Sequence, residues 1–527
     1  MAHLSENLAN ANQTVTTNTY GWLQNREHEE RLSYSAQNSA ALKHTKERWT
    51  GLVWNSADKQ NLVLPAGQAA YEIQYSVFEP LFGYTKWPKL PDRNATRQAF
   101  QEQIQDCVDA ITNLDVELER IKAGSSGSYF VYGTDGRKVP LGVFKPKDEE
   151  PYGPLSPKWT KWAHRTFFPC FFGRSCLIPN LGYVCESAAS VLDELLGTNL
   201  VPHTEIVSLM SKNFYDTKRA WLTTEPRVRH KTGSFQRFVE GYEGAGEFFE
   251  KYPFPGHYRD RPQPESQDRF SWNARTLAAF RIEVEKLIVL DYIMRNTDRG
   301  LDNWMVKVSQ LPDKSWEIKL AAIDNGLAFP WKHPDEWRSF PYGWLYLPVN
   351  ILAQPFLEAT RRHFLPLLTS TRWWETCFIE MTAQFGCDAE FKGRMWKKQW
   401  SVLKGQAFNV VETLKNPTQG PLELVRRTRT LVIDEVMQVP STTLPLNILH
   451  NAMEEPLSFS ASSPMIMSSV PEETTAPTDH GANRTVSIAP NESIEDSLPL
   501  AKDYPNKKVV IERLMLVNSK PPVFTWW

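Results

Sequence analysis

The stretch from Leu287 to Asn303 reads LIVLDYIMRNTDRGLDN and joins an apolar helical segment to a polar loop. In this loop, Asp298 precedes Asn303 at the spacing D-x-x-x-x-N. The spacing lets one carboxylate face a substrate hydroxyl while the amide oxygen reaches a metal ion. Downstream, residues 321–326 read AAIDNG, so Asp324 ends an apolar strand just before a glycine turn. A second carboxylate in this position is typical of a metal ligand in phosphoryl transfer.

Two upstream features occur in the order that this chemistry requires. Residues 124–131 read GSSGSYFV, and their glycines and serines can bring N–H groups and hydroxyls close to phosphate oxygens. Lys145 lies on the return strand of the hairpin that begins at this loop, where its ammonium would point at the α- and β-phosphates. Taken alone, each feature has an ordinary explanation, a turn or a lysine at a strand edge. Together with Asp298 and Asp324, they predict a kinase-like ATP site.

An ATP site of this kind needs a carboxylate that holds the lysine. Glu186 and Asp193 lie on or near a helix expected over Ser187–Leu196, and we favour Glu186 as the partner of Lys145. Phosphoryl transfer depends mainly on positioning and charge neutralisation, so Asp298 is expected to orient the hydroxyl more than to remove its proton.

The composition excludes several other classes of protein. The chain has 527 residues, of which 41% are hydrophobic, and a formal net charge of -2. It can therefore bury a large core, and it lacks the overall basic charge that would attract nucleic acid. Its cysteines form no CxxC pair, and no stretch approaches the ~18 apolar residues of a membrane-spanning helix. The first residues do not resemble a signal peptide, so any membrane contact would be peripheral.

Strand patterns come early and helical patterns come late, which predicts an α+β fold with two lobes. We expect a strand-rich N-lobe with a membrane-facing insert at 77–240 and a mostly helical C-lobe at 241–439. The polar stretches 1–76 and 440–527 are expected to be disordered, and the apolar end of the second suggests a docking segment. Individual elements are predicted at 97–123, 128–145, 187–196, 276–294, 318–323 and 378–414, with an exposed loop at 253–273.

The motifs around these residues resemble the phosphatidylinositol 4-kinase type II family. The similar stretches are 125–131, 143–147, 149–153, 157–162, 233–236, 238–242, 295–300, 302–304 and 321–330, with the terminal Trp526 and Trp527. The resemblance covers roughly residues 104–439. It implies a bilobal protein-kinase-like fold and transfer of the ATP γ-phosphate to the 4-hydroxyl of phosphatidylinositol, with Mg²⁺ or Mn²⁺ as the metal ion.

The resemblance also implies roles for individual residues. Catalysis is implied for Asp298, Asn303 and Asp324, of which Asn303 and Asp324 would hold the metal ion. Lipid binding is implied for Glu150, Pro151 and Tyr152. ATP binding is implied for Ser125, Ser126, Gly127, Ser128, Lys145, Asp324 and the hinge residues Gln236, Arg237, Phe238 and Val239.

The chain departs from the family at one membrane-binding motif. The family usually carries a palmitoylated Cys-Cys-Pro-Cys-Cys segment, whereas residues 167–171 here are Phe-Phe-Pro-Cys-Phe. Each buried phenylalanine would contribute roughly 1.5–3 kcal/mol in place of an acyl chain, and nearby basic residues would attract anionic lipid. The alternative is an aromatic core between the lobes. The residues predicted to face the membrane here are Trp159, Lys161, Trp162, Phe167, Phe168, Cys170, Phe171 and Phe172.

A second aromatic run, residues 337–346, follows Asp324 where an activation loop would lie. We predict that Trp337, Tyr342 and Trp344 face the membrane, with burial under a long loop as the alternative. The resemblance implies peripheral binding at the cytosolic face of Golgi, endosomal or plasma membranes. Its implied partners are phosphatidylinositol, anionic lipid and trafficking proteins that the tails would recruit.

Two rival functions stay open at the level of sequence. A protein kinase would share the chemistry, although the chain lacks His-Arg-Asp and Ala-Pro-Glu motifs. A scaffold that binds nucleotide without turnover would act through the tails, although Lys145, Asp298, Asn303 and Asp324 are all intact.

Overall fold

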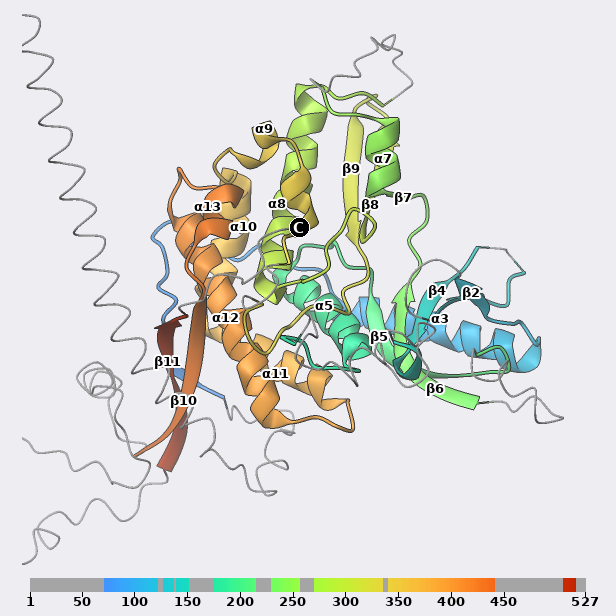
Figure 1. Cartoon of the computed structure of the whole chain (residues 1–527), viewed down its shortest axis with the longest axis horizontal. Coiled ribbons are helices and arrows are strands. Elements are labelled where there is room, and N and C mark those ends of the chain that lie inside the picture. The colour runs from blue at the N-terminus through green and yellow to red at the C-terminus, as the bar shows by residue number, and fades with distance from the viewer. Residues whose placement is uncertain are drawn as a thin grey trace, which may run out of the picture.

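The structure is a computed structural model that describes residues 71–121, 127–136, 139–150, 175–214, 229–255, 270–334, 340–440 and 506–517. Within these ranges the chain forms two lobes that lie side by side, one rich in strands and one mostly helical (Figure 1). This arrangement confirms the predicted α+β, bilobal kinase-like fold.

The N-lobe is built on one antiparallel sheet with the strand order β2-β3-β4-β6-β5. Strands β3 (Ser128–Val131) and β4 (Gly142–Pro146) pair with each other, which confirms the hairpin predicted over 128–145. A short 3-10 turn, η1 (Lys147–Glu149), follows β4 directly. The other strands of the sheet are β2 (Glu119–Ile121), β5 (Thr204–Ser211) and β6 (Arg229–Arg237).

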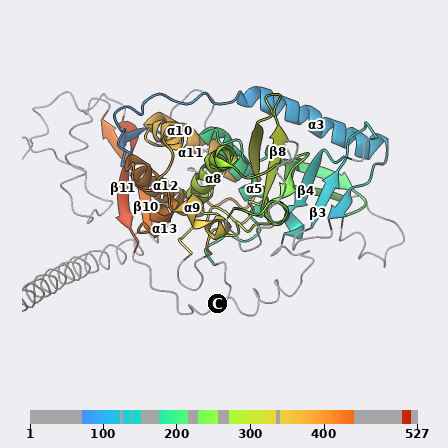
Figure 2. The same ribbon diagram turned by 90° about the horizontal axis from the view of Figure 1, so that it is seen from above.

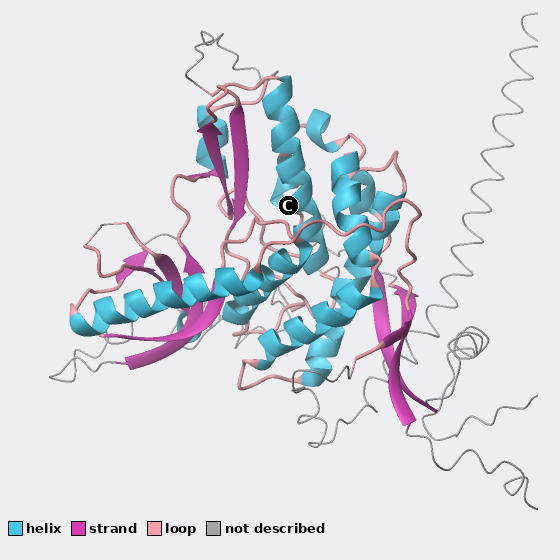
Figure 3. Ribbon diagram, turned by 180° about the vertical axis from the view of Figure 1, so that it is seen from behind, coloured by secondary structure: helices cyan, strands magenta, loops and turns pink. Residues whose placement is uncertain are grey.

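Two helices pack on this sheet. Helix α3 (Arg93–Asn113) crosses it (Figure 3) and buries Phe100 and Cys107 against aromatic residues of the strands. Helix α5 (Gly182–Leu196) lies between the sheet and the C-lobe, and nearly all of its side chains are buried. It ends at Gly197, whose φ of 64° is the left-handed geometry that glycine adopts without strain, as predicted for a C-cap.

The C-lobe is organised around two long helices that pack on each other, α8 (Ala274–Met294) and α12 (Gly393–Lys415). The start of α8 is fixed by reciprocal hydrogen bonds between Asn273 and Thr276. The remaining elements are β7 (Glu243–Gly244), α7 (Ala245–Lys251), β8 (Trp304–Gln310), β9 (Trp316–Ala322), η3 (Gly343–Tyr346), α9 (Val349–Leu352), α10 (Glu358–Leu368), α11 (Thr371–Gly386) and α13 (Pro421–Arg426).

The β8–β9 hairpin brings the two predicted metal-binding segments together. Its register places Trp304 opposite Ala322. The loop after α8 enters this hairpin at one strand, and Asp324 follows the other strand. The backbone N–H of Ile323 donates to the carbonyl oxygen of Asn303 at 3.1 Å, so the two segments lie side by side.

A third sheet joins both ends of the described chain. Strand β1 (Ile73–Tyr75) pairs in parallel with β11 (Asn506–Leu516), which pairs antiparallel with β10 (Thr430–Pro440). Seen from above, β10 and β11 lie at the opposite end of the molecule from β3 and β4 (Figure 2). Strands β1 and β11 fall within the stretches for which we predicted disorder, so that prediction is corrected at these residues. Their apolar side chains bury against the C-lobe, which compensates for the entropy lost on ordering.

Other predicted elements differ in their bounds. The helix predicted over 378–414 is two helices, because Asp388 accepts a hydrogen bond on Oδ1 from the N–H of Glu390 at 2.6 Å, a local turn that replaces helical bonds. The helix predicted over 97–123 already ends at Asn113. Most of the loop predicted over 253–273 lies outside the described residues.

Candidate active site

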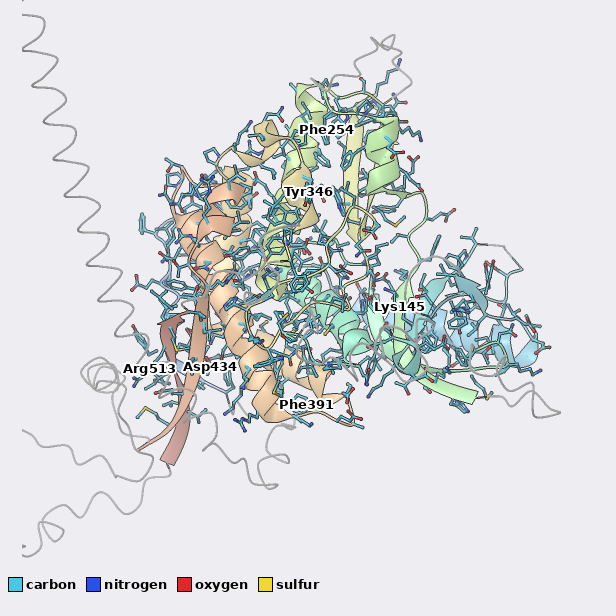
Figure 4. The ribbon with its side chains drawn as sticks, in the orientation of Figure 1. Lys145, Phe254, Tyr346, Phe391, Asp434 and Arg513 are labelled. Carbon is cyan, nitrogen blue, oxygen red and sulfur yellow. The ribbon has the colours of Figure 1, made fainter. Side chains whose placement is uncertain are left out.

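Three charged side chains from different elements meet where the lobes join. Lys145 on β4 donates from Nζ to Oε1 of Glu186 on α5 at 2.5 Å and to Oδ1 of Asp324 at 3.1 Å. Lys145 lies beside α5 (Figure 4). The structure confirms Glu186 as the partner of the lysine. Asp193, the alternative, instead accepts the N–H of Leu200 at 2.9 Å.

The pKa values of these three groups shift because of one another. Burial would lower the pKa of Lys145, but the carboxylates of Asp324 and Glu186 raise it overall. The charge of Lys145 lowers the pKa of Asp324. Burial raises the pKa of Glu186, and Lys145 opposes that shift. Near neutral pH the site thus holds a fixed cation for phosphate oxygens and an anion for a metal ion.

The loop after α8 is held in shape by its own polar groups. The backbone N–H of Asp298 donates to Oδ1 of Asn296 at 2.8 Å, and Nδ2 of Asn303 donates to the carbonyl oxygen of Asp298 at 2.6 Å. An asparagine that donates with its nitrogen can still bind a metal ion through its amide oxygen. Asp324 has a φ of 55°, an uncommon conformation that aspartate tolerates better than most residues.

A buried arginine ties the two metal-binding segments together. Arg299 has a fully buried side chain and donates from Nε to both carboxylate oxygens of Asp291 on α8 at 3.0 Å. Its Nη1 donates to the carbonyl oxygens of Asn303 and Ile323, the latter at 2.7 Å, and its Nη2 donates to Oδ1 of Asn325. These bonds fix the backbone of both segments relative to α8.

The sequence analysis missed Arg299 and Asp291. The available signal was a carboxylate within the apolar run LIVLDYIM, because a buried carboxylate needs a partner. Burial raises the pKa of Asp291 to about 6, and Arg299 opposes this shift. The Asp291–Arg299 pair therefore holds the backbone around the site in place. Neither residue lines the cleft described next.

A cleft that is open to solvent lies between the lobes. Its polar lining includes Lys145, Glu186, Asp298 and Asp324, so the residues predicted to hold phosphates, a metal ion and a hydroxyl share one cavity. The apolar part of the lining includes Pro146, Leu177, Ile178, Pro179, Leu181, Cys185, Leu327, Ala328 and Phe329.

The other residues predicted to bind ATP have different surroundings. Gly127 lines the cleft, and a Cβ there would lie 2.0 Å from the carboxylate of Glu149, so the close approach requires glycine. Ser128 is buried at the start of β3. Ser125 and Ser126 lie outside the described residues. Gln236, Arg237, Phe238 and Val239 lie where β6 ends and the chain crosses to the C-lobe, and they are not among the described residues that line the cleft.

The carboxylate of Glu150 is engaged at the first turn of α5. It accepts the backbone N–H groups of Gly182 at 3.1 Å and Tyr183 at 2.6 Å. Helix N-termini stabilise an anion in this position, which explains why α5 begins before the predicted Ser187. The lipid-binding role of Glu150, Pro151 and Tyr152 stays a prediction, since the last two lie outside the described residues.

The burial of Glu150 predicts a pH-dependent stability. Burial raises the pKa of Glu150 from 4.5 to about 7, although the amides of Tyr183 and Gly182 and the charge of Lys147 oppose the shift. Between these two pH values the folded protein holds a proton that the unfolded chain releases, so stability is lost as the pH rises through this range. We expect Glu150→Gln to flatten that loss in urea unfolding measured from about pH 5 to 8. Parallel pH profiles for wild type and variant would contradict this expectation.

Two residues predicted to face the membrane are buried instead. Trp344 has no exposed surface and Tyr342 is 5% exposed, and their rings stack at 4.8 Å between centroids. The prediction is therefore wrong for these two, and the alternative of a core under a long loop holds. The N–H of Gly343 donates to the carbonyl oxygen of Arg299 at 2.6 Å, which draws the turn inward. In the same turn Tyr346, which the sequence analysis did not single out, is 78% exposed.

The remaining membrane-facing predictions lie outside the described residues. They are Trp159, Lys161, Trp162, Phe167, Phe168, Cys170, Phe171, Phe172 and Trp337. No helix in the described ranges combines the length and hydropathy needed to cross a bilayer.

The oxygen donors at the site fit a hard divalent cation. Asp324 offers a carboxylate whose side chain is 52% exposed at the cleft, and Asn303 offers an amide oxygen. Mg²⁺ is usually held by one or two such protein ligands together with substrate phosphates and water. The residues predicted to hold the metal ion therefore suit an ion that arrives with a nucleotide.

A strand lysine that pairs with a helix glutamate and with an aspartate after the β8–β9 hairpin is an arrangement that positions the phosphates of ATP. Found in a cleft between a strand-rich and a helical lobe, it makes this chain a kinase, the class that uses ATP with a divalent metal ion. Comparison with known proteins narrows the class. The pattern of the phosphatidylinositol 3- and 4-kinases matches residues 124–405, more than half of the chain. The chain belongs to this family and, within it, to the type II phosphatidylinositol 4-kinases.

Several relatives carry this similarity along most of the chain. Phosphatidylinositol 4-kinase LSB6 of Saccharomyces cerevisiae is 52% identical over 525 residues, covering 90% of this chain and 85% of that one. Phosphatidylinositol 4-kinase type 2-beta of Danio rerio is 38% identical over 418 residues, covering 73% and 75%. Among solved structures, a Golgi casein kinase covers 64% of this chain and 78% of its own with 12% identity and a TM-score of 0.31, too distant to support an argument.

Proposed function

We propose that this chain transfers the γ-phosphate of ATP to the 4-hydroxyl of phosphatidylinositol and so forms phosphatidylinositol 4-phosphate. The proposal is carried by one observation: the Lys145–Glu186–Asp324 contacts share a cleft with Asp298. The assignment of phosphatidylinositol as the substrate is supported by relatives that are named phosphatidylinositol 4-kinases.

Each part of the site has a defined task in this reaction. Lys145 holds the α- and β-phosphates of ATP, and the loop at Gly127 approaches them with backbone N–H groups. The hinge residues 236–239 meet the adenine through backbone groups. Asp298 orients the inositol hydroxyl and accepts its proton as the hydroxyl oxygen bonds to the γ-phosphorus and the bond from that phosphorus to the departing ADP breaks.

Asp324 and Asn303 would hold the metal ion. Bound there, Mg²⁺ or Mn²⁺ would supply positive charge that offsets the negative charge of the ATP phosphates. Arg299 keeps the two ligands in register, since it bonds to the carbonyl oxygens of Asn303 and Ile323, the residue before Asp324.

The function is tested by supplying the full-length chain with radiolabelled ATP and phosphatidylinositol in mixed micelles. We expect labelled lipid whose head group carries the new phosphate at the 4-position. Labelled peptide from a peptide pool without lipid would instead identify a protein kinase. ATP binding without any labelled product would identify a scaffold, and either of these results would overturn the proposal.

We further propose peripheral binding to the cytosolic face of Golgi, endosomal or plasma membranes, with anionic lipid as a partner and the tails as sites for trafficking proteins. The exposed Tyr346 belongs to the aromatic run that was predicted to face lipid, and its exposure supports peripheral contact with a membrane. Aromatic side chains favour the head-group region of a bilayer, and basic residues add attraction to anionic lipid.

Membrane binding is expected to depend on the phenylalanines more than on Cys170. We expect Phe168→Ser to weaken binding to vesicles of phosphatidylcholine and phosphatidylserine about tenfold, from the lost burial of one aromatic ring. Cosedimentation with the vesicles measures this, and Phe82→Ser, which removes a fully exposed phenylalanine elsewhere, is the matched control. Loss of membrane association in cells that carry Cys170→Ser would refute the expectation.

A further inference from the structure

Helix α5 carries the glutamate on which the ATP site depends. Glu186 uses Oε1 for Lys145, and its Oε2 accepts the backbone N–H of Asn325 at 2.9 Å. Asn325 directly follows Asp324. A displacement of α5 would therefore part Lys145 from Glu186 and also release the turn that carries Asp324.

The first turn of α5 is held from the C-lobe by one aspartate. Asp388, in the turn between α11 and α12, accepts on Oδ2 from the hydroxyl of Tyr183 at 2.8 Å and from Nζ of Lys147 at 2.9 Å. Tyr183 is the second residue of α5, and Lys147 follows β4 only two residues after Lys145. Asp388 thus joins both elements that carry the Lys145–Glu186 pair to the C-lobe.

These three side chains, Asp388, Lys147 and Tyr183, form a compact cluster that we call the lobe latch. The side chain of Asp388 is 3% exposed and that of Lys147 is 28% exposed, and Nζ of Lys147 lies 5.4 Å from the centre of the Tyr183 ring. Charge-assisted bonds with so little solvent around them resist exchange with water better than surface ion pairs do.

The negative charge of Asp388 maintains the hydrogen bonds of the lobe latch at neutral pH. Burial would raise the pKa of Asp388, but the hydrogen bonds from Lys147, from the N–H of Glu390 and from Tyr183 lower it overall. The neighbouring carboxyl of Glu150 bonds to the amides of the same helix turn and adds a second restraint.

We propose that Asp388 is a positioning residue for ATP binding. Through Lys147 and Tyr183 it sets β4 and α5 relative to the C-lobe, and so keeps Glu186 against Lys145. Helix α5 packs against α11 where the two lobes meet (Figure 1), and the lobe latch joins the first turn of α5 to the turn that follows α11. This inference rests on the proposed function, because it assigns Asp388 a task in the same ATP-dependent transfer.

The first test compares Asp388→Asn with Glu390→Gln, which removes the same charge from an exposed residue of the same turn. Loss of a buried charge-assisted bond predicts a rise of about tenfold in the KM for ATP in Asp388→Asn. The KM for phosphatidylinositol should stay at the wild-type value. Tyr183→Phe should raise the KM for ATP less, Glu390→Gln should behave as wild type, and Asp388→Glu should recover part of the loss. An unchanged KM for ATP in Asp388→Asn would overturn the proposal.

A second test, made in protein that already carries Glu186→Gln, separates a positioning role of Asp388 from a general loss of stability. In Glu186→Gln protein, Lys145 has already lost the charged partner that α5 supplies and keeps only Asp324, so adding Asp388→Asn should raise the KM for ATP no further. A full additional rise in that background would overturn the proposal. If Asp388→Asn does not fold, Lys147→Met is judged by the same criteria.

The dissociation constant of a non-hydrolysable ATP analogue is measured for every variant. This constant should follow the KM for ATP, and it does not depend on which substrate accepts the phosphate. Weaker analogue binding in Asp388→Asn without any lipid product in wild type would therefore reject the lipid activity and keep the lobe latch.

Discussion

Asp298→Asn is expected to abolish most lipid phosphorylation while ATP binding persists. Asp298 lines the cleft, whereas Lys145 is held by Glu186 and Asp324, which the substitution leaves in place. The variant loses the carboxylate that we propose orients the hydroxyl and accepts its proton, and groups with this task contribute about 10²–10⁴-fold to the rate. We therefore expect kcat to fall by about that factor, with little change in the KM for ATP.

The matched control for this prediction is Asp302→Asn. Asp302 is an exposed carboxylate of the same loop, so this control removes an equal charge four residues away. Turnover of labelled ATP into lipid phosphate, measured beside analogue binding, should show wild-type behaviour for the control. Equal turnover in Asp298→Asn and wild type would exclude Asp298 from the chemistry. Equal losses in kcat and ATP affinity would instead indicate a damaged nucleotide site.

Lys404→Met is expected to cause the largest loss of stability. Lys404 on α12 has no exposed side-chain surface, and its Nζ donates to Oδ1 of Asp434 on β10 at 2.7 Å and to Glu512 on β11. Asp434 also accepts Nε1–H of Trp400 at 2.8 Å. Removing the cation leaves the buried Glu512 and the partly buried Asp434 without a positive partner, and breaking a buried pair in this way costs about 3–5 kcal/mol. Figure 4 shows Asp434 on the third sheet, far from Lys145, so the loss should concern folding and not chemistry.

Urea unfolding of the full chain measures this effect. Lys415→Met is the matched control on the same helix, because Lys415 pairs with Glu412 at a partly exposed site. Such a pair contributes about 0.2–1 kcal/mol. Neutralising both acids as well, with Asp434→Asn and Glu512→Gln, should recover part of the loss because no unpaired charge stays buried. Equal, small losses for Lys404→Met and Lys415→Met would contradict the assignment of a buried ion cluster.

The chemistry of the site was predictable because it is encoded locally. Asp298 and Asn303 belong to one loop, and their spacing is the one that the predicted phosphoryl transfer would require. Lys145 could be placed because it lies on a strand pattern, and Asp324 because it ends one. Each of these patterns is bordered by a recognisable turn. The hairpin over 128–145 and the helix that ends at Gly197 were found for the same reason, since turn and cap signals act over a few residues.

Predictions failed where the outcome depended on contacts between distant segments. The sequence of the aromatic run after Asp324 does not show which rings point inward. Gly343 bonds to Arg299 in the loop after α8, and in this turn Trp344 is buried while Tyr346 stays exposed. The strand at 506–516 was missed although its sequence, NKKVVIERLML, is largely apolar, because it follows a long polar stretch and its partners β10 and α12 are distant in the sequence.

The sequence by itself determined the two lobes, the order of the phosphate, metal and hydroxyl groups, and the family to which they point. Those features depend on residue types at short spacings, which can be recognised in one stretch of sequence without knowledge of the tertiary structure. Only the tertiary structure decided that Glu186 pairs with Lys145, that Arg299 joins the metal-binding segments, and that Asp388 anchors α5. Burial and pairing of charges depend on which distant elements remove them from water, and that is fixed only once the whole chain has packed.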